Sequence, residues 1–214
     1  TLFRSVWAHS YGDFEGAVKS DITQADAGIT QDFDFPALQD GAYGNLANDR
    51  RHAFKFYGNF QLAEDWNVGW NSSLVSGRPL SRFGKGYPNL DPSVFGSYGD
   101  TFYIFTNNCN TGGVIAPCTG AEPQSAKIYD YMTRGENGST PWLFNLDASL
   151  NYAFQTGDID WTASMSVYNL LDAHEPMMIN EHAETAEGLA NEFYGATYFW
   201  QAPRHFRFSI EARF

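Results

Sequence analysis

HFRFSIEARF, residues 205–214, alternates between polar and apolar side chains up to the last residue of the chain. Successive side chains of a β-strand point to opposite faces, so every second residue shares a face. One face of this segment would carry only apolar side chains, those of Phe206, Phe208, Ile210, Ala212 and Phe214. The opposite face would carry His205, Arg207, Ser209, Glu211 and Arg213. Because chain ends normally fray and are polar, this pattern predicts an ordered terminal strand with one apolar face.

The same alternation recurs in four earlier segments, residues 51–62, 66–74, 142–154 and 159–167. In each, the apolar set is rich in aromatic side chains, which make up 17% of the chain. A further strand, with mixed faces, is predicted over residues 2–11. Strands of this length suit a tilted segment that crosses a bilayer, which needs about 9–11 residues.

The connections between the predicted strands differ greatly in length. Those at residues 63–65 and 155–158 are short turns, whereas those at 12–51, 80–141 and 171–202 are long. Long loops are rare in compact soluble domains, and short turns at one end with long loops at the other are typical of outer-membrane barrels. We therefore predict an all-β fold, an antiparallel transmembrane β-barrel, with residues 1–214 forming a segment of one barrel domain. The alternative is a soluble β-sandwich or jelly roll, whose core strands favour Val, Ile and Leu.

Six strands are too few for a closed single-chain barrel, whose strand number starts at about eight. An open sheet edge in lipid would leave unpaired backbone groups, each at a cost of several kcal/mol. The predicted sheet must therefore pair with other strands, either of the same protein or of other chains. The first residues, TLFRSVWAHS, resemble the middle of a strand rather than a signal peptide, which favours a missing natural beginning.

Composition excludes some functions and indicates a compartment. The formal net charge is −12, which argues against a nucleic-acid-binding protein, and no apolar run is long enough for a transmembrane helix. Cys109 and Cys118 lie close together in a loop rich in Gly, Asn, Thr and Pro. This spacing predicts a local disulfide in an oxidising compartment; two free thiols or half of a metal site are the alternatives.

Several ordered motifs carry a resemblance to a known family. SVYNLLDAHEP (166–176) followed by APRHFRFSIEARF (202–214) resembles the C-terminal end of TonB-dependent outer-membrane receptors. Three further stretches are similar to the Oar-like subgroup: FDFPALQDGAYGNLANDRRHAFKFYGNF (33–60), SGRPLS (76–81) and RGENGSTPWLFNLDASLNY (134–152). The resemblance covers essentially the whole chain.

The resemblance implies a 22-stranded barrel plugged by an N-terminal domain, with this chain supplying the last six strands. Such a receptor lies in the outer membrane of a Gram-negative bacterium, binds a ligand at its extracellular loops and imports it with energy delivered by TonB. The implied partners are outer-membrane lipid and lipopolysaccharide, the remainder of the same protein including the plug, and TonB through the missing N-terminus. The barrel-assembly machinery would read Phe206, Phe208, Ile210 and Phe214 as its signal.

The polar strand faces would then line the lumen and contact the plug. The predicted plug-facing residues are Lys55, Asn59, Asn71, Asn145, Asp147, Asn151, Arg207, Glu211 and Arg213. The alternative is that they only solvate the inner wall or pair across strands, as Arg207 and Glu211 could.

The long loops carry the remaining candidate sites. Aromatics of the second loop are common types of binding anchor, although they could equally pack that loop around the disulfide. These candidate ligand-binding residues are Phe95, Tyr98, Phe102, Tyr103 and Phe105.

The first loop is acidic and the third contains histidines beside carboxylates. Carboxylates can bind Ca²⁺, but the first loop lacks the spacing of a calcium loop, which favours a solvated acidic segment. Its acidic residues are Asp13, Glu15, Asp21, Asp26, Asp32, Asp34 and Asp40. The third loop has His174, Glu175, Glu181, His182 and Glu184, without HExxH spacing, and capping of a short helix is the favoured interpretation. We predict no metal site and no cofactor.

Two other functional classes are considered. An outer-membrane enzyme would need a catalytic group such as the serine of G-x-S-x-G, which the chain lacks, so we predict no enzymatic activity. An adhesin, or a surface structural or partner-binding barrel without active transport, is the alternative to the receptor.

Overall fold

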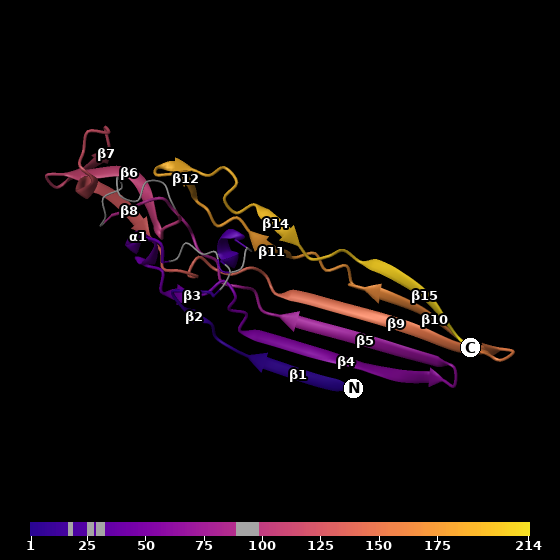
Figure 1. Ribbon diagram of the computed structural model, residues 1–214. Coiled ribbons are helices and arrows are strands. Elements are labelled where there is room, and N and C mark those ends of the chain that lie inside the picture. The colour runs from indigo at the N-terminus through magenta and orange to yellow at the C-terminus, as the bar shows by residue number, and fades with distance from the viewer. Residues whose placement is uncertain (17–18, 25–27, 29–32, 89–98) are drawn as a thin grey trace.

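The computed structural model describes residues 1–16, 19–24, 28, 33–88 and 99–214 of the chain. Its largest element is a six-stranded antiparallel sheet in which neighbours in space follow one another along the chain (Figure 1). The strands in order are β1 (Leu2–Trp7), β4 (His52–Ala63), β5 (Trp66–Val75), β9 (Leu143–Thr156), β10 (Ile159–Tyr168) and β15 (His205–Arg213). The predicted all-β, antiparallel fold is confirmed.

The six strands lie where the alternation predicts them, with one clear difference at the start. β1 ends at Trp7 rather than at residue 11. The backbone N–H of Ala8 still donates to the carbonyl of Arg51, but the chain then leaves the sheet and pairs as β2 (Tyr11–Gly12) with β3 (Gly44–Asn45). Residues 2–11 thus pair with two different partners, and within β1 itself Leu2 and Val6 share the polar face with Arg4.

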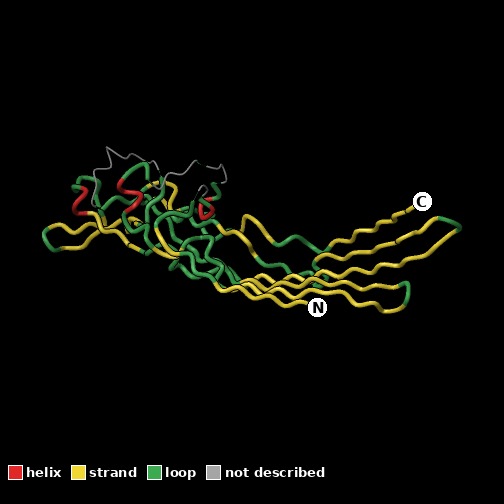
Figure 2. Tube along the Cα trace, turned by 60° about the horizontal axis from the view of Figure 1, so that its bottom comes forward, coloured by secondary structure: helices red, strands yellow, loops and turns green. Residues whose placement is uncertain are grey.

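The sheet has one short-turn end and one long-loop end, as expected. Two-residue turns, at 64–65 and 157–158, join β4 to β5 and β9 to β10. At the first residue of the second turn, Gly157 adopts a φ of 63°, a left-handed conformation that glycine tolerates without strain. Figure 2 shows the strands as a single layer, with the long connections gathered beyond the opposite end.

The pairing register separates the side chains into one apolar and one polar face. Phe54 lies opposite Leu74, and Leu74 lies opposite Phe144, on one side of the sheet. On the other side Asn71 lies opposite Asp147. This segregation continues to β15 and follows directly from the two-residue period of the sequence, since a slip of one residue would exchange the faces.

The apolar face is uncovered. Phe208, for example, keeps 71% of its surface exposed. The whole chain exposes 12552 Å², whereas a compact monomer of 24.0 kDa exposes about 9,900 Å². Within the described residues no second sheet packs on this face, so nothing supports the sandwich alternative, and the strand order leaves β1 and β15 as free edges rather than closing a barrel.

The three long connections fold against one another into what we call the loop body, the described parts of residues 8–51, 76–142 and 169–204. Its elements are β2, β3, α1 (Pro36–Gln39), β6 (Tyr103–Thr111), β7 (Val114–Pro117), β8 (Lys127–Tyr131), β11 (Pro176–Ile179), β12 (Glu184–Ala186), β13 (Leu189–Ala190) and β14 (Thr197–Trp200), with short 3₁₀ turns at Ser20–Ile22 and Gln124–Ala126. A small core of Ala42, Phe83 and Phe102 lies inside it. No helix in the described part of the chain has the length and apolarity needed to span a bilayer.

Candidate functional site

The strand register brings the predicted polar residues of the sheet to one face. Asn71, Asn145 and Asp147 also contact one another there. Asp147 accepts hydrogen bonds from the side-chain amide of Asn145 at 2.8 Å and from the backbone N–H of Asn169 at 3.0 Å. The side-chain amide of Asn71 donates to its other carboxylate oxygen at 3.4 Å. Asp147 is therefore the centre of a cross-strand polar cluster at the loop end of the face.

The remaining predicted residues are spread along the same face. Arg207 lies opposite Ser166 and Glu211 opposite Thr162, and Asn151 lies opposite both Asn67 and Ser164. Arg207 and Glu211 do not form the pair that the sequence suggested; the guanidinium of Arg213 lies 3.8 Å from Glu211 instead. Lys55 is opposite Arg4 and Ser73, and Asn59 is opposite Gly69.

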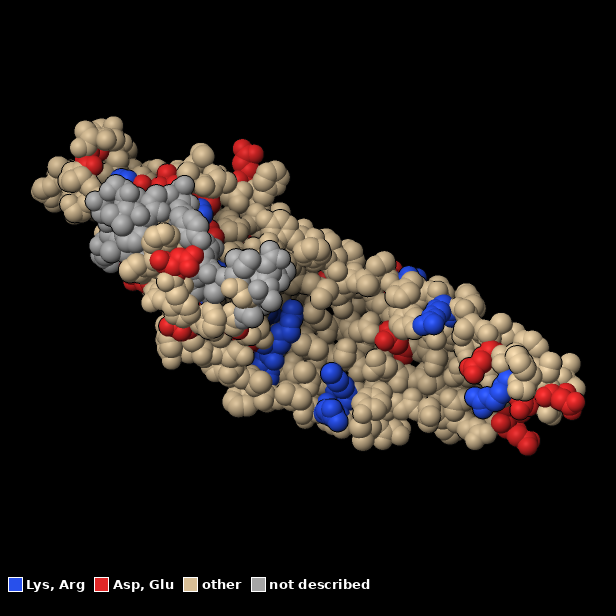
Figure 3. Space-filling view, viewed as in Figure 1, with Lys and Arg blue, Asp and Glu red and all other residues tan. Residues whose placement is uncertain are grey.

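Charges of both signs are scattered over the sheet, whose visible surface is otherwise uncharged (Figure 3). A hollow of about 350 Å³ is lined by Gly58 of β4 and by residues of β5, β9 and β10, among them Gly69, Asp147 and Ser149. Gly69, which lies opposite Asn59 and Ser149 on the polar face, leaves this part of the wall without a side chain. Amides, hydroxyls and single charges of this kind can hydrogen-bond a polar protein surface through many weak contacts.

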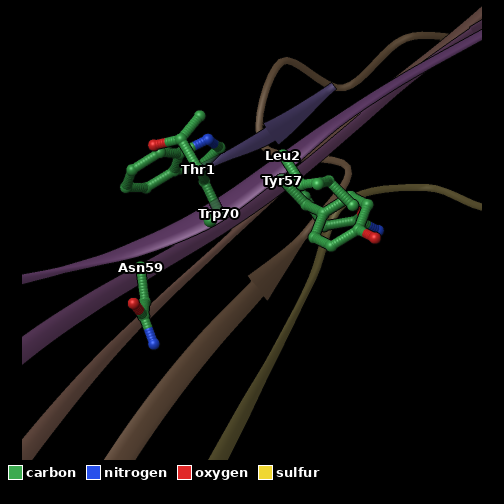
Figure 4. A pocket seen from close by; sticks show the side chains of 7 residues that line it. Thr1, Leu2, Tyr57, Asn59 and Trp70 are labelled. Atoms are coloured by element: carbon green, nitrogen blue, oxygen red, sulfur yellow. The ribbon is translucent and has the colours of Figure 1, made fainter. Parts of the chain in front are cut away.

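A larger hollow, of about 650 Å³, lies at the edge of the sheet beside the first residues of β1. In Figure 4, Thr1 and Trp70 lie on one side of β4 and Tyr57 on the other. Gly58 is required here, because a Cβ atom would come within 2.9 Å of the Trp70 indole. Pairing between β1 and β4 begins at Leu2 and Tyr57, so β4 continues past this point with one edge unpaired in the described chain. The hollow is therefore an open strand edge rather than an enclosed ligand pocket.

Buried ion pairs hold the loop body together. The guanidinium of Arg134 lies 3.2 Å from the carboxylate of Asp21, and both side chains are only 1% exposed. Arg134 also donates to the backbone carbonyl of Asp13 at 2.8 Å and lies over the Phe102 ring at 5.9 Å. This residue thus ties the second long connection to the first.

A second buried pair joins the second connection to the third. Arg78 forms a salt bridge with Glu181, which also accepts a hydrogen bond from the backbone N–H of Ser81. Burial raises the pKa of Glu181 to about 7, and the charge of Arg78 only partly opposes this. The folded state is therefore stabilised by the protonated form of Glu181. This stabilisation is lost as the pH rises from about 4.5, the ordinary pKa of a glutamate side chain, toward 7.

A third ionic group links Lys85, Asp100 and His182. The ammonium of Lys85 lies 2.8 Å and the imidazole Nδ1 of His182 lies 3.0 Å from the same Asp100 oxygen. Burial alone would raise the pKa of Asp100, but the His182 hydrogen bond and both neighbouring charges outweigh it and lower the pKa to about 2.

The expected capping of a short helix by the third loop is wrong. Residues 181–184 form no helix, because their carboxylates pair with the other connections instead. Glu184, for instance, accepts hydrogen bonds from the backbone N–H groups of Lys85 at 2.7 Å and Phe105 at 3.1 Å. Backbone N–H groups that are buried in a loop need hydrogen-bond acceptors of this kind. Arg78 of SGRPLS, which pairs with Glu181, was the available signal for one of these partners.

The aromatic residues proposed as ligand anchors fall into different environments. Phe102 is only 1% exposed and packs on Phe83, with ring centroids 5.3 Å apart, so it is a core residue and not a surface anchor. Tyr103 donates to Asp40 at 3.1 Å, and Phe105 packs on Tyr129. Burial of apolar rings drives this packing. Phe95 and Tyr98 lie outside the described residues.

Other aromatic side chains of the loop body are exposed and were missed by the sequence reasoning. Tyr43, Phe193, Phe199 and Trp200 project from the first and third connections. Their segments lack the long alternating pattern that the reasoning followed, and the strand that carries Phe199 and Trp200, β14, has only 4 residues.

The described acidic residues of the first loop do not gather into one cluster. Asp21 pairs with Arg134, and Glu15 accepts hydrogen bonds from Ser20; Asp26 and Asp32 lie outside the described residues. Among described residues, three metal-ligating side chains converge only at Cys109, Cys118 and Glu122. The two cysteines form a disulfide there, which removes their thiolates as ligands.

The Cys109–Cys118 disulfide braces the β6–β7 hairpin, with the two Cα atoms 5.1 Å apart. Replacing both cysteines with serine is expected to destabilise this hairpin by about 2–3 kcal/mol, the chain-entropy value for a loop of this length. Hydrogen exchange of the β6 and β7 amides, with and without the disulfide, measures the effect. Unchanged protection of both strands would contradict it.

The lowered pKa of Asp100 predicts that the stability of the loop body falls at low pH. Because the folded pKa of about 2 lies below the ordinary 3.8, this stabilisation is present above about pH 4 and is lost as the pH falls toward 2. The loss is about 2 kcal/mol, from 1.36 kcal/mol for each pKa unit. Thermal unfolding of the loop body between pH 2 and 5 tests it, and Asp100→Asn, the control, should flatten this part of the profile.

No family model, curated protein or solved structure matches this chain. The class of protein therefore follows from the structure itself: an all-β chain with an open antiparallel sheet, apolar on one face and polar on the other, that bears a folded body of long loops at one end.

Proposed function

We propose that this chain forms part of the wall of a β-barrel in the outer membrane of a Gram-negative bacterium, in a TonB-dependent receptor that binds a ligand at its loops and imports it. The observation that carries the proposal is the uncovered apolar face. In water, exposed aromatic and aliphatic side chains over six strands would be costly, at about 25 cal/mol for each Å². In lipid the same face would lie in an apolar medium, and this cost would not arise.

The arrangement of aromatic side chains supports a membrane orientation. Trp7 and Trp142 mark the loop end of the apolar face, while Trp66 and Tyr152 stack at 4.5 Å near the turn end. Bands of aromatics near both membrane interfaces are typical of outer-membrane barrels. The loop body would then face the exterior and the short turns the periplasm.

The free edges of β1 and β15 support further strands beside them. Each edge would leave unpaired N–H and C=O groups in lipid, which a closed barrel avoids. A 22-stranded barrel, as the sequence resemblance implies, would meet this need with strands from the rest of the same protein. The polar face would then line the lumen, where its amides and charges would contact the plug.

Cysteine labelling in outer membranes tests the face assignment. Phe208 and Ser209 are neighbours on β15 that point to opposite faces, and the natural cysteines are already paired. We expect Phe208→Cys to react with a lipid-soluble maleimide and to resist a charged one. Ser209→Cys should react with the charged reagent once the plug is removed. Equal reaction of both sites with the charged reagent would refute a membrane-facing sheet.

Dependence on TonB, the energy source for import, distinguishes a transporter from an adhesin. Asn151→Cys, on the polar face, should be shielded from a charged maleimide by the plug and should become more reactive in cells with active TonB than in cells without it. Labelling that is independent of TonB would favour the adhesin or structural barrel.

A further inference from the structure

A polar cavity of about 300 Å³ lies where the sheet meets the loop body. It is formed by the segment before β4, the segment after β5 and the segment before β9. Asn45, Asp49, Arg51, His52, Ser139 and Trp142 are among the residues that line it. Its size is at the lower limit of ligand sites, about 300–1,000 Å³, and suits a single ring rather than a chain of rings.

One wall of the cavity is continuous with the apolar face. Ser76 and His52 pair across the strands, with the Ser76 N–H donating to the His52 carbonyl at 2.8 Å. The ring of Trp142 stacks on His52 with centroids 6.0 Å apart, and His52 stacks on Phe54 at 6.3 Å. The cavity therefore opens at the loop end of the apolar face, at the level proposed for the outer membrane interface.

The other wall offers fixed hydrogen-bonding groups. The Nε–H of Arg51 donates to Asp49 at 3.0 Å, and its Nη2 donates to the Asn45 side chain at 2.8 Å. The same Nη2 lies 3.0 Å from Nε2 of His9. Asp49 also accepts the backbone N–H of Ser10 at 3.0 Å and is almost wholly buried. These contacts hold the guanidinium plane while part of it stays exposed to the cavity.

We propose that this cavity binds the sugar ring of a glycolipid headgroup in the outer leaflet. The proposal rests on the proposed function, because it requires the apolar face to lie in lipid. Of the residues lining the cavity, only Arg51 and Asp49 carry a fixed charge, and they neutralise each other. An uncharged ring with several hydroxyls fits such a site better than a phosphate, which would approach the Asp49 carboxylate.

The recognition has two parts. The ring's C–H groups stack on the exposed face of Trp142, whose π-system is negative at its face. Its hydroxyls accept from Arg51 and exchange hydrogen bonds with Asn45 and Ser139. The acyl chains then extend over Phe54 and Phe144, which lie in the next row of the apolar face. One lipid would thus occupy both the cavity and the sheet.

Native mass spectrometry of the full protein in phosphatidylcholine nanodiscs tests the proposal, with monogalactosyl diacylglycerol as the probe. We expect selective retention of this lipid, reduced about fivefold to tenfold by Trp142→Ala, the size expected for a lost aromatic contact. Trp7→Ala is the matched control, since Trp7 is an exposed tryptophan opposite His52 that does not line the cavity. Arg51→Lys keeps the charge beside Asp49 but removes the planar fork, and should also weaken retention.

Three results would overturn the proposal. Phosphatidylglycerol retained as well as the galactolipid would make this an anion site. Equal losses of galactolipid retention from Trp7→Ala and Trp142→Ala would indicate only that exposed tryptophans at this end of the sheet favour glycolipids in general. Free methyl galactoside that binds as tightly as the lipid would exclude a role for the acyl chains. The labelling of Phe208→Cys and Ser209→Cys separates failure of this site from failure of the membrane assignment itself.

Discussion

Replacing Phe56 with arginine is expected to destabilise the membrane-inserted protein by about 2–4 kcal/mol, the cost of a cation on the lipid face near the bilayer midplane. Phe56 lies near the middle of β4, opposite Phe3 and Ser72 on the apolar face. Its side chain is exposed in the isolated chain, so little packing within the chain would be lost. The loss of stability would come from placing the arginine charge in lipid.

Asn59→Arg, three residues further along β4, is the matched control. Asn59 is also exposed but belongs to the polar face, where a charge should cost less than about 1 kcal/mol. Denaturant unfolding of the full protein in lipid vesicles measures both variants. If the two arginines cost the same, the apolar face does not meet lipid, and the proposed function fails with it.

Replacing Arg134 with methionine is expected to destabilise the loop body by about 3 kcal/mol, the lower end of the range for breaking a buried pair, because the Asp21 carboxylate is left with the more distant Lys19 ammonium, 3.9 Å away. Asp21 would lose its contact with Arg134 in a place where its side chain is 1% exposed. The first and second connections would separate most readily. Limited proteolysis of the loop body and hydrogen exchange of β8, which ends at Tyr131 shortly before Arg134, report the loss.

Two further variants decide whether burial is the cause. Arg82 pairs with Asp130 on the surface, so Arg82→Met should cost less than about 1 kcal/mol. Adding both Asp21→Asn and Lys19→Met to Arg134→Met should recover part of the stability, since together they remove the other two buried charges of this group. Failure of both expectations would show that Arg134 acts through packing on Phe102 rather than through its charge.

Strand placement could be read from the sequence because it depends on a local property. Residues 206–214 alternate with a period of two, and the same period places Phe54, Leu74 and Phe144 on one face once the register is known. The two short turns fix the register of β4 with β5 and of β9 with β10, whereas β5 and β9 are joined by the long connection 76–142, and there the need to keep the apolar residues on one face sets the register. Sequence reasoning also placed the cysteine pair, because Cys109 and Cys118 are only 9 residues apart.

The loop body was not predictable in the same way. Its contacts join residues far apart in the chain, such as Asp21 with Arg134 and Arg78 with Glu181. Phe102 became core and not an anchor for the same reason, since its environment is supplied by Ala42 and Phe83 from other segments. A single sequence carries no periodic signal for such pairs.

The sequence by itself determined the all-β class, the position of the strands and the division of their side chains into an apolar and a polar face, because these depend on neighbours one and two residues away. Only the tertiary structure decided which carboxylates are buried in ion pairs, which aromatics are core, and where Arg51, Asn45 and Trp142 enclose a cavity. Those outcomes depend on three long connections meeting in space, where the cost of burying each charge or backbone group is met by a partner from another connection.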